Sequence, residues 1–218
     1  MATESLRIEP KTAVNIQGRT IEIVVGPNQD TFSVHEALIR ASSPFFDKVM
    51  GGEWKGTAHR RVELPDYESK ILSIYIHWLY CGTFPIRSGD SDAYENDVEY
   101  LKLVKAYVLG GKLMDTSFQN DIIDAIVEKS CYDTPEEFQF SPGEDAIVYA
   151  YKNTTDSAPI RELLVDIYVS QGIGQWLSEA RTSARFPQPF LLALAAKLLD
   201  QRETMPDDDL EASNYHQQ

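Results

Sequence analysis

The side chains best suited to catalysis or metal binding are two cysteines and four histidines in a chain of 218 residues. The cysteines are Cys81 and Cys131, and the histidines occupy positions 35, 59, 77 and 216. His77 and Cys81 lie four residues apart and can share a helix face, but a structural zinc ion takes four ligands. Phosphate-binding glycine motifs are absent from the sequence. The sequence therefore predicts no metal and no cofactor.

His35 is the sharpest candidate for a general base, because it ends an alternating segment and precedes a helical one. The sequence fixes no cysteine or carboxylate beside it, so we interpret His35 as a packed side chain at a strand-to-helix corner. Cys81 is expected to be a small buried residue at a helix end. A thiol-dependent hydrolase stays as the alternative, and it requires a Cys–His pair within hydrogen-bond reach. We predict no catalytic residue and no enzyme.

Composition argues against several further classes of protein function. The 34 acidic and 20 basic residues give a net charge of −14, which argues against direct binding to nucleic acid or anionic membranes. No apolar run has membrane-spanning length, and the N-terminus shows no signal-peptide pattern. Two unpaired thiols indicate a reducing compartment. The expected location is the cytoplasm, the nucleus or both.

The first part of the chain combines a small sheet with helices. Alternating apolar residues predict strands over 20–26 and 31–35, which form a hairpin around a turn, and a third strand over 61–65. Between them, 35-HEALIRASSPFFDKVM-50 reads as two helical pieces, the second capped by Ser43 and started by Pro44. Helical periodicity follows over 68–84, 98–111 and 118–126. This order predicts an α+β fold, not alternating βαβ units.

The second part reads as helical throughout. Capping signals precede helices expected around 147–151, 160–168, 176–180 and 190–199. The apolar stripes Ile160–Leu163–Leu164–Ile167 and Phe190–Leu191–Leu194–Leu198 must be buried, so we expect these helices to dock on the preceding part around Phe118–Val127. The predicted organisation is a flexible N-terminus over 1–17, a domain over 18–130, a linker over 131–141, a helical extension over 142–203 and an acidic tail over 204–218.

Several motifs together resemble the BTB/POZ domain family over about residues 18–130. They are "VH" at the end of the second strand, "SPFF" at the start of the next helix, "WLYCGTF" in the helix after "RVELP", and "LGGKLMD" after the following helix. The form "WLYCGTF", with "GEWKG" upstream and "YAYKNTTDSAPIRELLVDIYV" downstream, resembles the fungal branch of that family, whose members carry a helical extension. The resemblance implies a three-stranded sheet with a cluster of helices.

The resemblance also implies a function in protein recognition. Family members self-associate, act as substrate receptors for cullin-type ubiquitin ligases, or regulate transcription, and they use the surface built from 35–50. We therefore expect a non-enzymatic adaptor or scaffold with a protein partner. Cullin-binding members carry an apolar residue followed two positions later by an acid. Trp54 supplies the first, but Gly56 stands in place of the second, so cullin binding should be weak.

The remaining expectations concern partner and assembly. The predicted contact residues are Phe45, Phe46, Val49, Met50 and Trp54. Residues 1–17 show no amphipathic helix of the kind that family dimers exchange, so we expect a monomer or a weak homodimer. A DNA-binding regulator is disfavoured because no zinc-finger spacing or basic stripe follows the domain.

Overall fold

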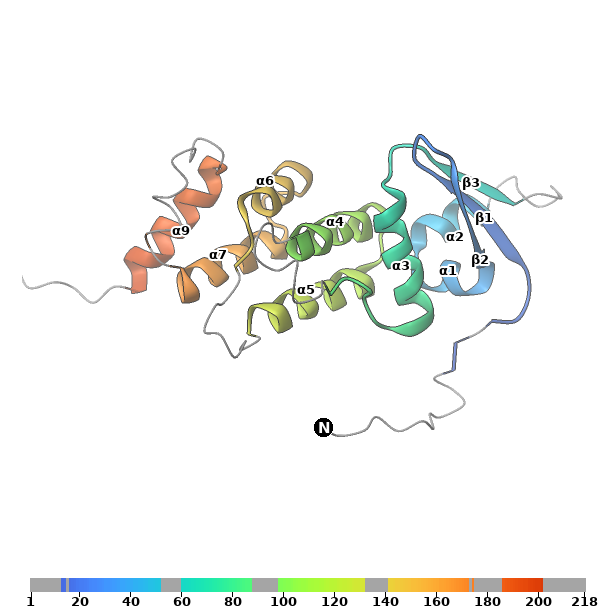
Figure 1. Cartoon of the computed structure of the whole chain (residues 1–218), viewed down its shortest axis with the longest axis horizontal. Helices are drawn as coiled ribbons and strands as arrows, with labels where there is room; N and C mark the ends of the chain where they lie inside the picture. Colours follow the sequence, from blue (N-terminus) through green and yellow to red (C-terminus); the bar gives the residue numbers. More distant parts are fainter. Residues whose placement is uncertain are drawn as a thin grey trace, which may run out of the picture.

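The computed structural model describes residues 13–14, 16–51, 60–87, 98–131, 141–172, 174 and 186–201. Its elements follow one another along the long axis of the molecule (Figure 1), with the sheet at one end and the last helix at the other. One continuous hydrophobic core runs through this arrangement, from Ile21 in the sheet to Leu194 in the last helix. The described residues of both parts therefore share their buried surface.

A three-stranded mixed sheet forms the first end. Strands β1 (Thr20–Val25) and β2 (Asp30–His35) pair antiparallel, and β1 pairs parallel with β3 (Arg61–Leu64), which gives the order β2-β1-β3. Ile21, Ile23 and Val25 alternate inward on β1, as their spacing predicts. Gly26 turns the chain between β1 and β2 with a φ of 70°, a conformation that glycine adopts without steric cost.

Helices α1 (Glu36–Ser42) and α2 (Pro44–Gly51) form the predicted helical pair beside the sheet. The bend between them is fixed by Ser43, which is fully buried. Its hydroxyl accepts a hydrogen bond from the Phe46 amide at 3.3 Å and donates one to the Leu113 carbonyl at 2.7 Å. The cap predicted from "SSP" is confirmed, and it also ties the bend to a distant part of the chain.

Helices α3 (Ser69–Cys81), α4 (Val98–Lys112) and α5 (Thr116–Ser130) form the middle of the molecule. Helix α4 packs on both α3 and α5. The α3–α5 contact is aromatic, because Phe118 meets Tyr75, Trp78 and Phe84 with ring centroids 4.9, 5.0 and 5.9 Å apart. Gly82 ends α3 in the left-handed conformation, as a glycine after a helix predicts.

The C-terminal helices are α6 (Glu144–Asn153), α7 (Pro159–Gln171) and α9 (Gln188–Gln201). Helix α6 packs on α4, α7 on α6, and α9 on α7. The main contact of the extension with the preceding part is thus between α6 and α4, whereas docking is expected from the sequence around Phe118–Val127 of α5. Phe118 and Ile126 are themselves fully buried, and Phe118 packs on the aromatic residues of α3 and the segment that follows it. The side chain of Gln171 still reaches the end of α5, donating to the Ser130 carbonyl at 2.8 Å.

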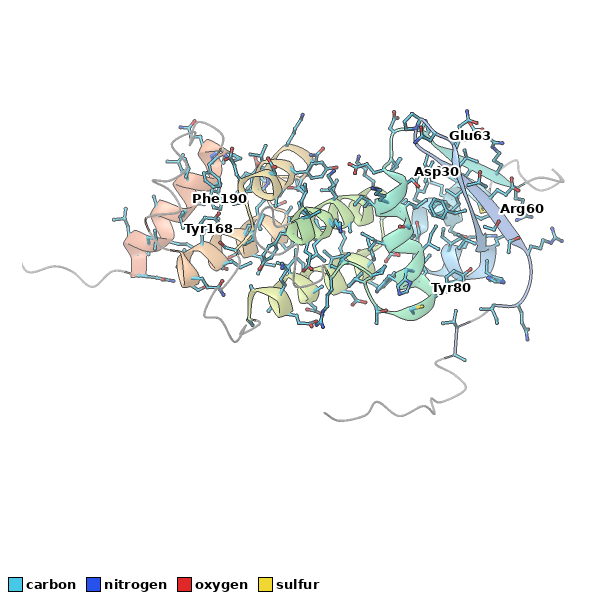
Figure 2. The ribbon with its side chains drawn as sticks, in the orientation of Figure 1. Asp30, Arg60, Glu63, Tyr80, Tyr168 and Phe190 are labelled. Atoms are coloured by element: carbon cyan, nitrogen blue, oxygen red, sulfur yellow. The ribbon has the colours of Figure 1, made fainter. Side chains whose placement is uncertain are left out.

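The buried stripe of the last helix is shorter than expected. Phe190 and Leu194 are buried, but Leu198 remains 45% exposed. Phe190 lies beside Tyr168 (Figure 2), with ring centroids 5.2 Å apart, and its centroid is 5.6 Å from that of Phe186. The predicted helix over 176–180, most of the linker over 131–141 and the tail over 204–218 lie outside the described residues.

Candidate protein-contact surface

His35, at the start of α1, makes polar contacts with Tyr80. Its Nδ1 lies 2.7 Å from the hydroxyl of Tyr80 on α3, and its backbone N–H donates to the same oxygen at 3.0 Å. The two rings also meet edge to face. His35 is half-buried and has its ring nitrogen engaged by a phenol, so the interpretation as a packed corner histidine agrees with the geometry.

A buried carboxylate fastens the α1–α2 pair to the middle helices. Asp115, only 1% exposed, accepts hydrogen bonds from the hydroxyls of Ser42 and Tyr75 and, as the cap of α5, from the Phe118 amide at 3.0 Å. Burial, reinforced by the charge of Asp115, raises the pKa of Tyr75. In the sequence, Asp115 is recognisable only as a possible cap, from "LMDT" before a helix. This pattern does not indicate which residues of α1 and α3 donate hydrogen bonds to it.

Burial of the side chains on α2 determines which of the predicted contact residues are accessible to a partner. Phe46 and Met50 point into the core at 0% and 3% exposure, so they position the helix and do not form its outer surface. Phe45 and Val49, one turn apart, are only partly buried and form the accessible apolar part of α2. Trp54 and Gly56 lie outside the described residues.

One further apolar residue, missed by the sequence reasoning, lies beside α2. The Phe45 amide hydrogen-bonds the Leu113 carbonyl at 3.4 Å, which brings the turn after α4 to the start of α2. Met114 in that turn is 48% exposed and has a φ of 55°, unusual for a residue other than glycine. We call Phe45, Val49 and Met114 the α2 surface. Of these three residues, only Met114, which is distant in sequence, was found from the structure.

A group of ion pairs joins α1 to α2. Arg40 of α1 donates to the Asp47 carboxylate through Nε and Nη2, at 2.8 and 2.7 Å, and to Glu36 at 3.0 Å. These hydrogen bonds, that with Asp47 first, raise the pKa of Arg40. Arg60 pairs with Glu36 from the other side. These ion pairs tie α1 to α2 and to Arg60, and so help to hold α2 in place.

The two thiols do not form a catalytic site among the described residues. Cys81 and Cys131 are free and exposed, so the expectation that Cys81 is buried is wrong. Cys81 is the last residue of α3 and lies at the surface. His77 lies 3.2 Å from the Thr83 hydroxyl, and His35 is engaged by Tyr80, so in this part of the chain neither histidine hydrogen-bonds a cysteine. Nor do the described residues bring together three potential metal ligands of the His, Cys, Asp and Glu types.

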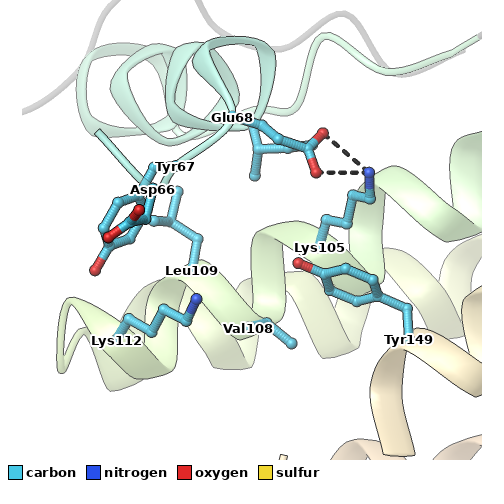
Figure 3. A pocket seen from close by; sticks show the side chains of 9 residues that line it. Asp66, Tyr67, Glu68, Lys105, Val108, Leu109, Lys112 and Tyr149 are labelled. Atoms are coloured by element: carbon cyan, nitrogen blue, oxygen red, sulfur yellow. Dashed lines mark hydrogen bonds and ion pairs between the residues drawn. The ribbon is translucent and has the colours of Figure 1, made fainter. Parts of the chain in front are cut away.

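A small pocket lies where α3, α4 and α6 meet (Figure 3). The Lys105 ammonium donates hydrogen bonds to both carboxylate oxygens of Glu68, at 2.7 and 2.9 Å. The same nitrogen lies 5.5 Å from the centre of the Tyr149 ring. Lys112 lies over the Tyr67 ring at 5.2 Å. The volume of about 50 Å³ has room for a few water molecules, well below the usual size of a ligand site. The Lys105–Tyr149 contact therefore joins α6 to α4, and the other two pairs join α4 to the residues before α3.

Comparison with known proteins identifies the class. The model of the BTB/POZ domain family matches residues 16–115, and the three-stranded mixed sheet with its helices is the BTB fold, followed here by C-terminal helices. Residues 16–115 are thus a BTB/POZ domain, a protein-interaction module. The matched segment ends at Asp115, the residue that fastens α1 and α3 to the start of α5.

Individual relatives are distant. Human Kelch-like protein 30 is 28% identical over 90 residues, which is 41% of this chain and 14% of that protein. The chain thus spans about a seventh of this curated relative. Among solved structures, the BTB domain of zebrafish PATZ1 is 16% identical with a TM-score of 0.36, covering 50% of this chain and 75% of that one. No helix in the described part of the chain is both long and apolar enough to cross a membrane.

Proposed function

We propose that this chain is a non-enzymatic adaptor or scaffold that recognises another protein by shape and apolar contact. The observation that carries the proposal is the α2 surface, held on a BTB/POZ domain by the hydrogen bond that Ser43 donates to Leu113 and the one that Asp115 accepts from Ser42. A surface fixed in advance loses little conformational entropy on binding. The motif "WLYCGTF" and the helical extension support placing the chain in the fungal branch, and a reducing location in the cytoplasm or nucleus suits its free thiols.

The α2 surface has the composition that the proposal requires. Phe45 and Val49 supply aromatic and β-branched apolar area, and Met114 supplies a side chain that adapts its shape to a partner. Trp54 is proposed to extend this surface. Phe46 and Met50 act indirectly, by fixing the orientation of α2 from inside.

Affinity capture with a matched control tests the proposal. The tagged chain is exposed to lysate of its organism, and captured proteins are identified by mass spectrometry beside Val49→Glu, Phe45→Ala and Trp54→Ala variants. We expect a specific partner to be lost with these variants but kept with Val98→Glu, which alters an equally apolar residue, 46% exposed, on α4. Melting temperatures verify that each variant is folded. Equal capture by all folded variants would show that the α2 surface is not the binding site.

An adaptor of a cullin-RING ubiquitin ligase is the second candidate. Trp54 supplies the apolar half of the cullin-contact motif of the family, and Gly56 lacks the acidic half. Binding to a cullin N-terminal domain, measured by calorimetry, should therefore be weak and should strengthen in Gly56→Glu. Nanomolar binding by the unaltered chain, on the order of −12 kcal/mol, would contradict the argument from Gly56. A transcriptional regulator and a thiol-dependent hydrolase remain less favoured readings.

A further inference from the structure

Helix α9 is apolar on two opposite faces. One face carries Phe190 and Leu194, which are buried against α7 and its neighbours. The other carries Leu192 and Leu199, which are 62% and 58% exposed, with exposed alanines between them. A helix that is apolar all round normally lies within a core. Helix α9 instead stands at the free end of the molecule (Figure 1), so half of its apolar surface lacks a partner among the described residues.

The exposed residues form one regular stripe, which we call the α9 stripe: Leu192, Ala195, Ala196 and Leu199. Their spacing of i, i+3, i+4 and i+7 places them on one side of the helix and equals the spacing of a helix–helix contact seam. Charged side chains avoid it. Lys197 turns away to pair with Glu162 and Asp166 of α7, at 3.3 and 2.5 Å.

We propose that the α9 stripe pairs with the α9 stripe of a second copy of this chain, with the two helices antiparallel. The order Leu–Ala–Ala–Leu reads the same in both directions. A twofold axis at the level of Ala195 and Ala196 sets Leu192 of one copy against Leu199 of the other. The alanines in the centre let the two backbones approach closely, while the leucines fill the space at each end.

Charge supports a second copy in this orientation. A chain with a net charge of −14 repels copies of itself over most of its surface, but α9 carries only Lys197 and Asp200 and is neutral. In the antiparallel pair, Asp200 near the C-terminus of one α9 approaches the N-terminal turn of the other. An acidic side chain is stabilised beside helix N-terminal amides and disfavoured at its own C-terminus. A parallel pair would instead bring the two Asp200 carboxylates together.

The residues after α9 fit the stripe poorly. Residues 202–218 contain five acidic residues and one proline, and their larger apolar side chains, Met205, Leu210 and Tyr215, are spaced by five. That spacing does not form a helical stripe. Four side chains over two turns also bury less than the ~800 Å² per partner of a standard interface. The pair is therefore weak and reversible, and it depends on protein concentration.

Sedimentation equilibrium of the full chain over micromolar to millimolar concentrations tests this pairing. We expect an average mass that rises from one chain toward two. Leu192→Glu and Leu199→Glu should each raise the dissociation constant at least tenfold, while Val127→Glu, 40% exposed on α5, should leave it unchanged. A chain that stays monomeric throughout, or a dimer unaffected by both leucine variants, would overturn the proposal. Deleting residues 202–218 serves as a check, because stronger association afterwards would show that they cover the stripe.

Cysteine cross-linking tests the orientation. In chains with Cys81→Ser and Cys131→Ser, a mixture of Leu192→Cys and Leu199→Cys variants should oxidise mainly to the mixed disulfide. Ala196→Cys should form a homodimeric disulfide. Efficient self-linking of Leu192→Cys with little mixed product would indicate parallel helices and refute the antiparallel pair. Thermal unfolding of the reduced variants confirms that the substitutions leave the fold intact.

Discussion

The hydroxyl of Tyr75 donates a hydrogen bond of 2.9 Å to the carboxylate of Asp115, 40 residues later in the chain. The same carboxylate takes the Ser42 hydroxyl and caps α5, so one buried acid holds α1, α3 and α5 together. The orientation of α2, and with it the α2 surface, depends on this group. Its removal should therefore affect stability and recognition together.

Replacing Asp115 by Ala should destabilise the fold strongly. The change removes a helix cap and leaves buried hydroxyls without an acceptor, at a cost of about 2–4 kcal/mol. Urea denaturation measures the loss. Asp124→Ala on the exposed side of α5 is the control and should change stability by less than about 0.5 kcal/mol. Equal effects of the two substitutions would show that Asp115 does not hold the helices together.

Two adjacent glycines in α4 should respond oppositely to alanine. A Cβ at Gly110 would lie 2.8 Å from Gln119 Cγ and 2.9 Å from Phe118 Cδ1, so Gly110→Ala should force α4 and α5 apart at a cost of about 1–3 kcal/mol. At Gly111 the nearest atom is the flexible amide end of Gln119 at 3.1 Å. Gly111→Ala should be neutral or stabilise by up to about 1 kcal/mol. Thermal melts compare them, and a stabilising Gly110→Ala would contradict the close approach of the two helices.

Alkaline pH should weaken the packing of the extension. Burial, with the nearby charge of Glu144, raises the pKa of Tyr168 to about 12 from an ordinary value near 10. The folded state therefore binds more protons than the unfolded state between these values, and the free energy of unfolding falls as pH rises from 10 to 12. The contribution lost is on the order of 2 kcal/mol. Denaturation at pH 9 and 11 should show a smaller decrease in Tyr168→Phe, and an identical decrease would contradict this assignment.

Truncation at Ser141 should destabilise the BTB/POZ domain. It removes α6 from α4 and leaves apolar surface of α4 uncovered, so the shortened chain should melt at a lower temperature and aggregate. Scanning calorimetry and light scattering measure both effects. A shortened chain that melts with the full-length protein and stays soluble would show that the extension is an independent appendage.

Both thiols should react in the folded protein. Cys81 and Cys131 are exposed and unpaired, so Ellman's reagent should titrate two thiols without denaturant. Replacing each by Ser should change stability by less than about 0.5 kcal/mol, because no buried contact is lost. Slow reaction that becomes fast only in urea would mean that the thiols are covered.

The sequence predicts the local elements well, because periodicity and caps are local properties. The strands of the sheet, the Ser43 cap and the helix stop at Gly82 all follow from neighbouring residues. The features that the sequence does not predict depend on contacts between residues far apart in the chain. Nothing near Cys81 reveals that it lies at the surface, and nothing near Asp115 names its partners on α1 and α3. The apolar pattern of α5 likewise does not say whether it packs on the middle helices or on the extension.

The α2 surface was predicted only in part for the same reason. "SPFF" marks α2, but helical spacing alone leaves open which of two adjacent phenylalanines points inward. In the structure Phe46 is fully buried in the core, whereas Phe45 is only partly buried. Met114 joins them through a turn more than 60 residues away, a relationship that one sequence does not contain.

The serial packing of α4, α6, α7 and α9 has a consequence for how the molecule opens. The helices contact one another in this series, and α9 at its end packs mainly on α7 alone, so opening should start at α9 and proceed inward, as in a linear array. Amide hydrogen exchange should then show a gradient, fastest in α9 and slowest in the sheet and α4. A protease acting on the native protein would release the last helix first. Self-recognition through α9 could thus be lost by limited cleavage while the α2 surface at the other end remains intact.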